Sequence, residues 1–316
     1  DSEEGRFVAS SIFEEKYKSQ LRNDQFAVLY RTNAQSRSIE DALRRKNIPF
    51  QIFGGLSFYQ RKEIKDIIAY LRLIVNPNDE ESLKRIINYP PRGIGQTTLD
   101  KIQIFSNENN LTVFDIVEDI NNSEININNG TKQKLFDFVT MIKSFQIANE
   151  NLNALEILNE VLKRVGVVNL LKNEGTPESI SRIENIEELI NAVQDFIDGQ
   201  KEIVDSNGSL SEFLEDVALI SDLDKDIEKA EPKVSLMTIH LAKGLEFSNV
   251  YIVGLEEDLF PSALSSTTRS DLEEERRLFY VALTRAKKKV TLSHSKTRYR
   301  WGKLNDCEPS RFISEI

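Results

Sequence analysis

Arg285 stands at the polar end of an apolar helical run, in the tetrad Thr284-Arg285-Ala286-Lys287. The run at 277–283 is apolar enough to be buried, whereas an arginine is not buried without a partner. A guanidinium held at this position can reach a phosphate bound by another domain and stabilise the charge that develops during phosphoryl transfer. The alternative interpretation is an amphipathic helix with a basic rim.

A second polar group lies within residues 234–254, which predict a strand, a loop, a short helix and another strand. The polar residues are Thr238, His240, Lys243 and Glu246. Ligands in open α/β sheets bind where loops leave the carboxyl ends of strands, so we expect these four side chains to be grouped at such an end. Each is weak evidence alone, because a single histidine is more often structural.

The N-terminal part shows similar patterns. Residues 26–30 predict a buried strand, and Arg31 opens the polar loop that leads into a helix. Gly54 and Gly55 end a further strand, and a helix with apolar residues at i, i+3, i+4 and i+7 follows. Arg92 lies in a Pro-Pro-Arg-Gly-Ile-Gly turn. Its glycines would let backbone N–H groups approach a phosphate, although an ordinary tight turn has the same composition.

Together these stretches resemble the UvrD/Rep-type superfamily 1 DNA helicases. The resemblance is to motif IV at residues 26–37, motif V at 234–254 and motif VI at 273–286, and it covers most of 1–102 and 233–316. It implies an α/β fold in which a RecA-like parallel-sheet domain is interrupted by an all-helical inserted subdomain.

The resemblance also implies nucleotide contacts. Arg31 and Arg285 would both reach the γ-phosphate of ATP as catalytic arginines, Tyr30 would stack on adenine, and Glu246 would accept a hydrogen bond from the ribose. A strand-end core residue is the alternative for Tyr30. For Glu246 the alternative is a charge favoured by a helix N-terminus.

Contacts to single-stranded DNA are implied for Thr238, His240 and Arg92. The resemblance adds a duplex junction as a further partner and 3′-to-5′ polarity for translocation. Trp301 has two interpretations, stacking on a base or packing in a hairpin, and its place after the last predicted strand favours packing.

Two expected nucleotide-binding elements are missing from the sequence. It contains no Gly-x-x-x-x-Gly-Lys-Ser/Thr phosphate loop, and no Asp-Glu pair follows an apolar strand as a magnesium-binding box. In the resembling helicases both belong to a first RecA-like domain that precedes motif IV. We therefore expect an excised C-terminal half that neither hydrolyses ATP nor unwinds DNA alone, with ATP and Mg²⁺ held mainly by the missing N-terminal domain in cis.

Charge divides the chain unevenly. Of the 316 residues, the segment 111–232 has 10 Lys and Arg against 25 Asp and Glu, whereas the remainder has 31 against 26. The acidic segment has helical periodicity, so we predict a sheet domain at 1–110 and 233–316 and an inserted helical bundle at 111–232. Predicted flexible loops and joints are at 107–110, 121–130, 205–209 and 230–232.

The cysteine and histidine counts and the length of the apolar stretches exclude several classes of protein. One cysteine, Cys307, excludes an internal disulfide, and two histidines in the whole chain make a zinc site a poor interpretation. No apolar stretch is long enough to cross a membrane. We expect a bacterial cytoplasmic protein that acts with repair or replication proteins. The alternatives are the core of a recombination helicase-nuclease, or a non-catalytic module that binds DNA or a repair protein.

Overall fold

The computed structural model describes residues 2–201, 208–227, 232–265 and 268–316. The chain divides into two compact units. The sheet unit comprises Asp1–Arg61 and Leu219–Ile316, and the helical unit comprises Lys62–Ala218. The predicted loop at 205–209 and the predicted joint at 230–232 both extend outside the described residues.

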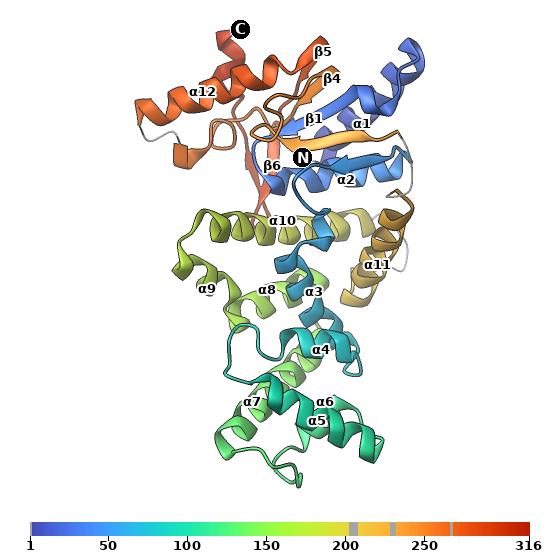
Figure 1. Ribbon diagram of the computed structural model, residues 1–316, viewed down its shortest axis with the longest axis vertical. Coiled ribbons are helices and arrows are strands. Elements are labelled where there is room, and N and C mark those ends of the chain that lie inside the picture. The colour runs from blue at the N-terminus through green and yellow to red at the C-terminus, as the bar shows by residue number, and fades with distance from the viewer. Residues whose placement is uncertain (1, 202–207, 228–231, 266–267) are drawn as a thin grey trace. The chain divides into compact units, whose positions relative to one another are not determined.

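Five parallel strands form the main sheet, in the order β2-β3-β1-β4-β5 (Figure 1). Their bounds are Phe26–Tyr30 for β1, Phe50–Ile52 for β2, Val234–Thr238 for β3, Phe247–Ile252 for β4 and Ala286–Leu292 for β5. The predicted α/β class with a parallel sheet is confirmed.

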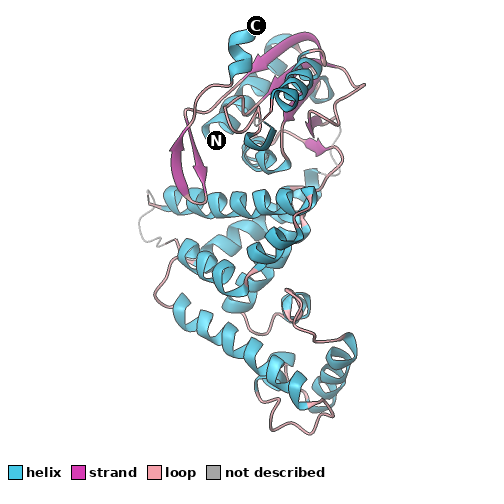
Figure 2. Cartoon of the chain, turned by 90° about the vertical axis from the view of Figure 1, so that its left-hand side faces the viewer, coloured by secondary structure: helices cyan, strands magenta, loops and turns pink. Residues whose placement is uncertain are grey.

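Helices cover both faces of the sheet (Figure 2). Alternate residues of β1 belong to two different core clusters: Phe26, Val28 and Tyr30 pack with one set of helices, and Ala27 and Leu29 with the other. Because β1 is buried on both faces, its sequence is a continuous apolar run rather than an alternating pattern.

The first face is covered by α1 (Ser2–Ser19) and α2 (Ser36–Arg45), and the second by α12 (Arg269–Leu283) with the short helix η5 (Arg311–Glu315). An antiparallel hairpin of β6 (Thr297–Arg300) and β7 (Lys303–Asp306) follows β5. The other short 3-10 helices are η1 (Asn23–Gln25), η2 (Asn33–Gln35), η3 (Phe58–Gln60) and η4 (Ala263–Ser265).

The helical unit contains only helices and loops in its described residues. The helices that lie wholly within it are α3 (Lys62–Val75), α4 (Glu80–Ile86), α5 (Gln96–Asn109), α6 (Val113–Glu118), α7 (Asn129–Asn149), α8 (Ala154–Val165), α9 (Val167–Glu174) and α10 (Pro177–Gln200). A further helix, α11 (Leu210–Ile227), begins in the helical unit and ends in the sheet unit. None of the described helices is long and apolar enough to span a membrane.

Asparagines in this unit serve as helix caps. Asn128 accepts a hydrogen bond from the Thr131 N–H and begins α7, and Asn110 ends α5 in the left-handed conformation. The predicted loop at 107–110 is therefore mostly the last turn of α5. Both positions favour asparagine, because its short side chain hydrogen-bonds the nearby backbone and the residue tolerates a positive φ.

The boundaries between the units differ from those predicted at 110/111 and 232/233. Residues 62–110 belong to the helical unit because the apolar residues of α3 pack against α7, α8 and α10. Local periodicity shows that α3 has an apolar face but does not show which helices cover it.

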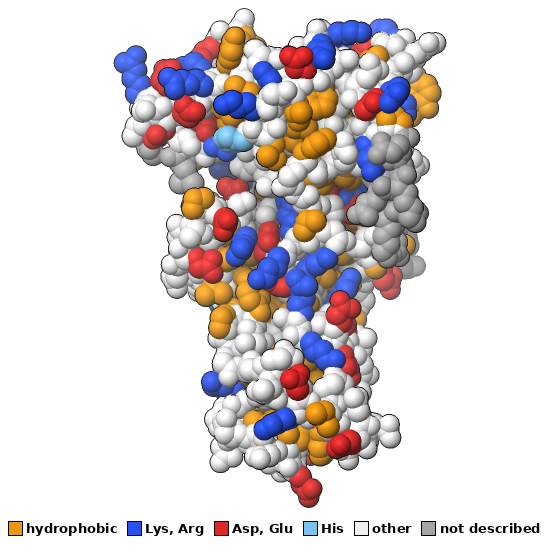
Figure 3. Space-filling view, viewed as in Figure 1, with side chains coloured by type: hydrophobic (Ala, Val, Ile, Leu, Met, Phe, Trp, Pro, Cys, Tyr) orange, Lys and Arg blue, Asp and Glu red, His pale blue; other side chains and the backbone are white. Residues whose placement is uncertain are grey.

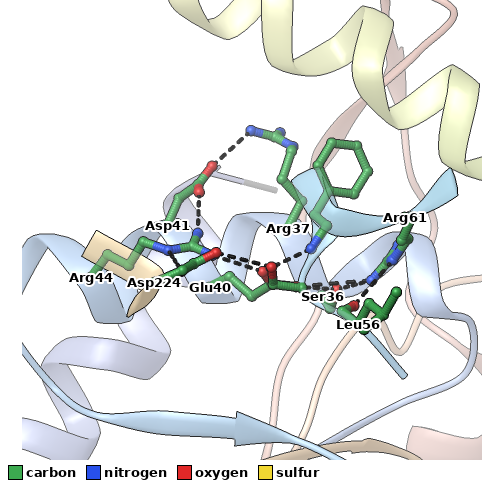
Figure 4. A network of polar contacts seen from close by, with 10 residues as sticks. Ser36, Arg37, Glu40, Asp41, Arg44, Leu56, Arg61 and Asp224 are labelled. Carbon is green, nitrogen blue, oxygen red and sulfur yellow. Dashed lines mark hydrogen bonds and ion pairs between the residues drawn. The ribbon is translucent and has the colours of Figure 1, made fainter. Parts of the chain in front are cut away.

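A buried ion network holds the chain where it leaves and re-enters the sheet unit (Figure 4). The fully buried Glu40 of α2 accepts hydrogen bonds from Ser36 Oγ at 2.6 Å and Arg44 Nη2 at 3.0 Å. Arg44 Nε donates to Asp224 of α11 at 2.7 Å, and Arg61 Nη2 donates to Ser36 Oγ at 2.6 Å. Both connections, near Arg61 and near Asp224, are thus bonded to α2.

Candidate functional site

Arg31 follows the carboxyl end of β1 and is fixed at both of its ends. Gln35 Oε1 accepts hydrogen bonds from the backbone N–H groups of Arg31 and Thr32, each at 2.9 Å. The guanidinium binds Glu275 of α12: Nε lies 3.0 Å from each carboxylate oxygen and Nη2 lies 2.6 Å from Oε1. The side chain of Glu275 is only 5% exposed and that of Arg31 19%.

Thr238 and His240 lie beside this pair. Thr238 ends β3 in register with Tyr30, and the Ile239 N–H donates to the Tyr30 carbonyl at 3.0 Å. His240 keeps an exposed edge, but partial burial of its ring, followed by the Arg31 cation, lowers its pKa below the ordinary 6.5. The negative charge of Glu275 acts against this shift and raises the pKa of His240. The carboxyl edge of the sheet therefore presents hydroxyl, imidazole and guanidinium groups together.

Tyr30 does not fit the role predicted for it. Its side chain is fully buried in the core between the sheet and α1 and α2, so its ring offers no face to an adenine base. Burial, with Glu40 second, raises the pKa of its hydroxyl. This hydroxyl has no hydrogen-bond partner among the described residues. The strand-end core interpretation is the correct one.

Arg285 and Glu246 lie at the opposite, amino edge of the sheet. Phe247 opens β4 in register with Ala286 of β5, and its N–H donates to the Arg285 carbonyl at 2.9 Å. Arg285 Nε donates to the Val281 carbonyl at 3.0 Å and Nη1 to the Leu245 carbonyl at 3.1 Å. Its guanidinium therefore lies against the end of α12, at the surface of the sheet unit.

Glu246 is exposed at the same edge, and its Oε2 lies 3.4 Å from Lys287 Nζ. Two exposed side chains of opposite charge are therefore adjacent to Arg285. A guanidinium can bind phosphate oxygens and a carboxylate can accept from ribose hydroxyls, so these groups fit a nucleotide. Among the described residues, no group of three or more His, Cys, Asp or Glu side chains could hold a metal ion.

The expected grouping at 238–246 is therefore wrong. Residues 239–244 form turns, not a short helix, and with the loop residues 245–246 they lead from the carboxyl end of β3 to the amino end of β4. Thr238 and His240 lie at one edge, and Glu246 lies at the other.

The two arginines are separated in the same way. Glu275, which holds Arg31, and Leu283, two residues before Arg285, are eight residues apart in α12, about 12 Å of helix rise. Arg31 and Arg285 therefore do not converge on one phosphate. The error arose because the spacing of motifs along the chain does not show which end of a parallel strand each residue occupies.

Arg92 belongs to the helical unit, where its guanidinium supports a turn. Nη1 donates to the carbonyls of Ile86 and Tyr89 at 2.9 and 3.1 Å, and Nη2 to the Tyr70 hydroxyl at 2.6 Å. Asn88 Oδ1 accepts from the backbone N–H of Arg92 at 2.9 Å. These contacts show that Arg92 stabilises the turn itself.

Glu275 was not predicted as a site residue, although its position in the sequence indicates a role. Glu275 is one of three consecutive glutamates, but it alone lies one helical turn before the buried Phe279. A glutamate on the buried face of a helix needs a cationic partner, and Arg31 is that partner. Trp301 lies at the β6–β7 turn with φ of 52° and is 43% exposed. The hairpin therefore buries only part of Trp301, and the favoured interpretation of hairpin packing accounts for that part alone.

Known proteins resemble this chain in sequence. The family of UvrD-like helicase C-terminal domains matches residues 1–297. Proteins named ATP-dependent DNA helicase PcrA are similar: those of Staphylococcus epidermidis and Staphylococcus aureus are 39% identical over 318 residues, and that of Leuconostoc citreum is 39% identical over 317. Each alignment covers 100% of this chain and 42% of the relative, so the chain spans about two fifths of their length.

Proposed function

The chain belongs to the family of UvrD-like helicase C-terminal domains, and from that premise we propose that it is the C-terminal part of an ATP-dependent DNA helicase. The names of its relatives support this function. The sheet unit would be the second RecA-like domain and the helical unit its inserted subdomain. In the longer protein, ATP binding and hydrolysis would close and reopen the cleft between two RecA-like domains, which moves the protein along single-stranded DNA in the 3′-to-5′ direction.

The observation that carries this proposal is the separation of two polar groups at opposite edges of one sheet. Arg285 and Glu246 at the amino edge suit a nucleotide, whereas Arg31, Thr238 and His240 at the carboxyl edge suit the phosphates of a DNA strand. This arrangement changes the role of Arg31 from a second γ-phosphate contact to a DNA contact, because its guanidinium lies with the DNA candidates.

ATP would supply the free energy for movement, and Arg285 would stabilise the charge that develops on the transferred phosphate. Its three nitrogens donate hydrogen bonds to the carbonyls of Val281 and Leu245 and to the Thr284 hydroxyl. These bonds use three of the five N–H donors of the guanidinium, so one N–H on each terminal nitrogen is left to donate to a phosphate. We propose that Mg²⁺ and the β- and γ-phosphates are held by a part of the protein outside this chain, so the chain alone would be inactive.

The helical unit has a net negative charge, with 15 Lys and Arg against 27 Asp and Glu. Nevertheless, Lys and Arg side chains gather on one face of it, over the region of α3, α8 and α10 (Figure 3). A local basic face can attract a duplex even when the whole unit is acidic, because exposed charges more than about 10 Å apart are screened. We propose a duplex junction, and repair or replication proteins, as partners in a bacterial cytoplasm.

Two substitutions in the full-length protein test the division between the edges. We expect Arg285→Ala to lower kcat for DNA-stimulated ATP hydrolysis about a thousandfold with little change in ssDNA affinity. We expect Arg31→Ala to weaken ssDNA binding about tenfold and to reduce the dependence of binding on salt. Steady-state kinetics and fluorescence anisotropy with oligodeoxythymidylate measure both. Equal losses of kcat and DNA affinity in both variants would contradict the assignment.

A further inference from the structure

The contact between Arg31 and Glu275 joins two segments that lie far apart in the sequence. Glu275 is buried on α12 and receives two nitrogens of the Arg31 guanidinium, Nε and Nη2. The Ser262 N–H also donates to Glu275 Oε2, at 3.4 Å, so the carboxylate itself is held. The third nitrogen, Arg31 Nη1, has no hydrogen-bond partner in the part of the chain that the structure describes.

A guanidinium is planar and rigid, so fixing one side of it fixes the direction of the other. With Nε and Nη2 on Glu275, the remaining nitrogen points in one direction instead of sampling many. The backbone N–H of Arg31 is bonded to Gln35, so the side chain is fixed at its root as well. Such preorganisation reduces the conformational entropy that a long side chain loses when it binds a phosphate.

We propose that Glu275 is a positioning residue for DNA binding, which holds Arg31 so that Nη1 faces a strand phosphate beside Thr238 and His240. This inference rests on the proposed function. Glu275 contacts no ligand itself and acts only through Arg31. Its buried ion pair has its main value in the direction that it gives to the guanidinium, because buried pairs contribute little net stability.

The sign of one substitution separates this role from simple electrostatics. Glu275→Gln removes a negative charge beside a site for a polyanion, so electrostatics alone predicts tighter DNA binding. Loss of positioning predicts weaker binding, because an amide oxygen accepts less strongly and its NH2 group faces an arginine that can only donate. The two explanations therefore predict changes in opposite directions.

The experiment measures binding of oligodeoxythymidylate to the full-length protein by fluorescence anisotropy. We expect Glu275→Gln and Arg31→Ala each to weaken binding about tenfold. The double variant should bind as weakly as Arg31→Ala alone, since Glu275 acts through Arg31. Glu273→Gln is the matched control, because Glu273 lies on the same helix and pairs with Arg276 at the surface. It should bind as the wild type does.

The outcomes distinguish this inference from the proposed function. If Arg31→Ala leaves DNA binding unchanged, the proposed DNA edge is wrong and the inference fails with it. If Arg31→Ala weakens binding but Glu275→Gln does not, or if the two losses multiply in the double variant, only the positioning role is wrong. Should Glu275→Gln not fold in a thermal melt, Glu275→Asp keeps the charge but shortens the arm, and we expect it to weaken binding too; wild-type affinity in that variant would overturn the proposal.

Discussion

At the scale of single residues, the carboxyl edge of the sheet owes its properties to the environment of each side chain. Tyr30 ends β1 and His240 follows the neighbouring strand β3, yet His240 is exposed and Tyr30 is fully buried. Their types alone do not separate them, because tyrosine and histidine are each found both inside and outside proteins. Contacts decide what each residue can do.

The lowered pKa of His240 gives a pH dependence with a definite sign. Burial, and then Arg31, lower the folded-state pKa below 6.5, so the unfolded chain takes up this proton first as the pH falls. The contribution of His240 is therefore fully present above pH 6.5 and is lost as the pH falls through the lower folded pKa. Urea unfolding at pH 7.5 and pH 5.5 should show a smaller loss of stability in His240→Gln than in the wild type. An equal loss in both proteins would contradict the stated environment.

At the scale of elements, the close approach of α1 to α2 depends on a glycine. Gly5 of α1 is buried, and a Cβ atom built on it would collide with the backbone carbonyl oxygen of Ser38 in α2. Backbone cannot yield as a flexible side-chain tip does. The helices would have to separate, which also disturbs the core between them and β1.

We therefore expect Gly5→Ala to destabilise the sheet unit by about 1–3 kcal/mol. The matched control is Gly199→Ala in α10, where a Cβ atom would meet nothing within 4 Å. Since alanine favours helix more than glycine does, this control should be neutral or stabilising by up to about 1 kcal/mol. Urea denaturation measures both. Destabilisation of similar size in the two variants would show that packing against Ser38 is not the cause.

How much could be predicted from the sequence differs between elements. The strands at 26–30, 234–238 and 247–252 and the helix before Arg285 were predictable, because strand burial and helix periodicity are local patterns. The two-edge arrangement of the site was not. It depends on the register of β1 with β3 and of β4 with β5, which pairs residues that are distant in the chain.

At the scale of the whole molecule, the sequence indicated an inserted helical unit but not its limits. The charge change at 111–232 marks only part of the unit, because α3 to α5 have near-balanced charge and share its core. The structure places the exits at 61/62 and 218/219. At each exit a residue of the sheet unit, Arg61 or Asp224, belongs to the network around α2.

Two deletions in the full-length protein compare these boundaries. Replacing residues 62–218 with a Gly-Ser linker keeps Arg61 and Asp224, removes α3 to α10 together and cuts α11 at the unit boundary. Replacing 111–232 leaves α3 without α7, α8 and α10 and removes Asp224. We expect a cooperative melt and retained DNA-stimulated ATPase activity, with altered unwinding, only for the first deletion. A better fold for the second deletion would favour the boundaries predicted from charge.

The strand order also has a consequence for synthesis on the ribosome. The central strand β1 emerges before the helical unit, whereas both of its neighbours, β3 and β4, emerge after it. The nascent chain therefore exposes its most apolar strand while an entire second unit is translated. The helical unit can complete its own core during that interval, since its helices pack mainly on one another. The sheet can close only after β3 and β4 have emerged, so we expect chaperones to bind β1 during this interval.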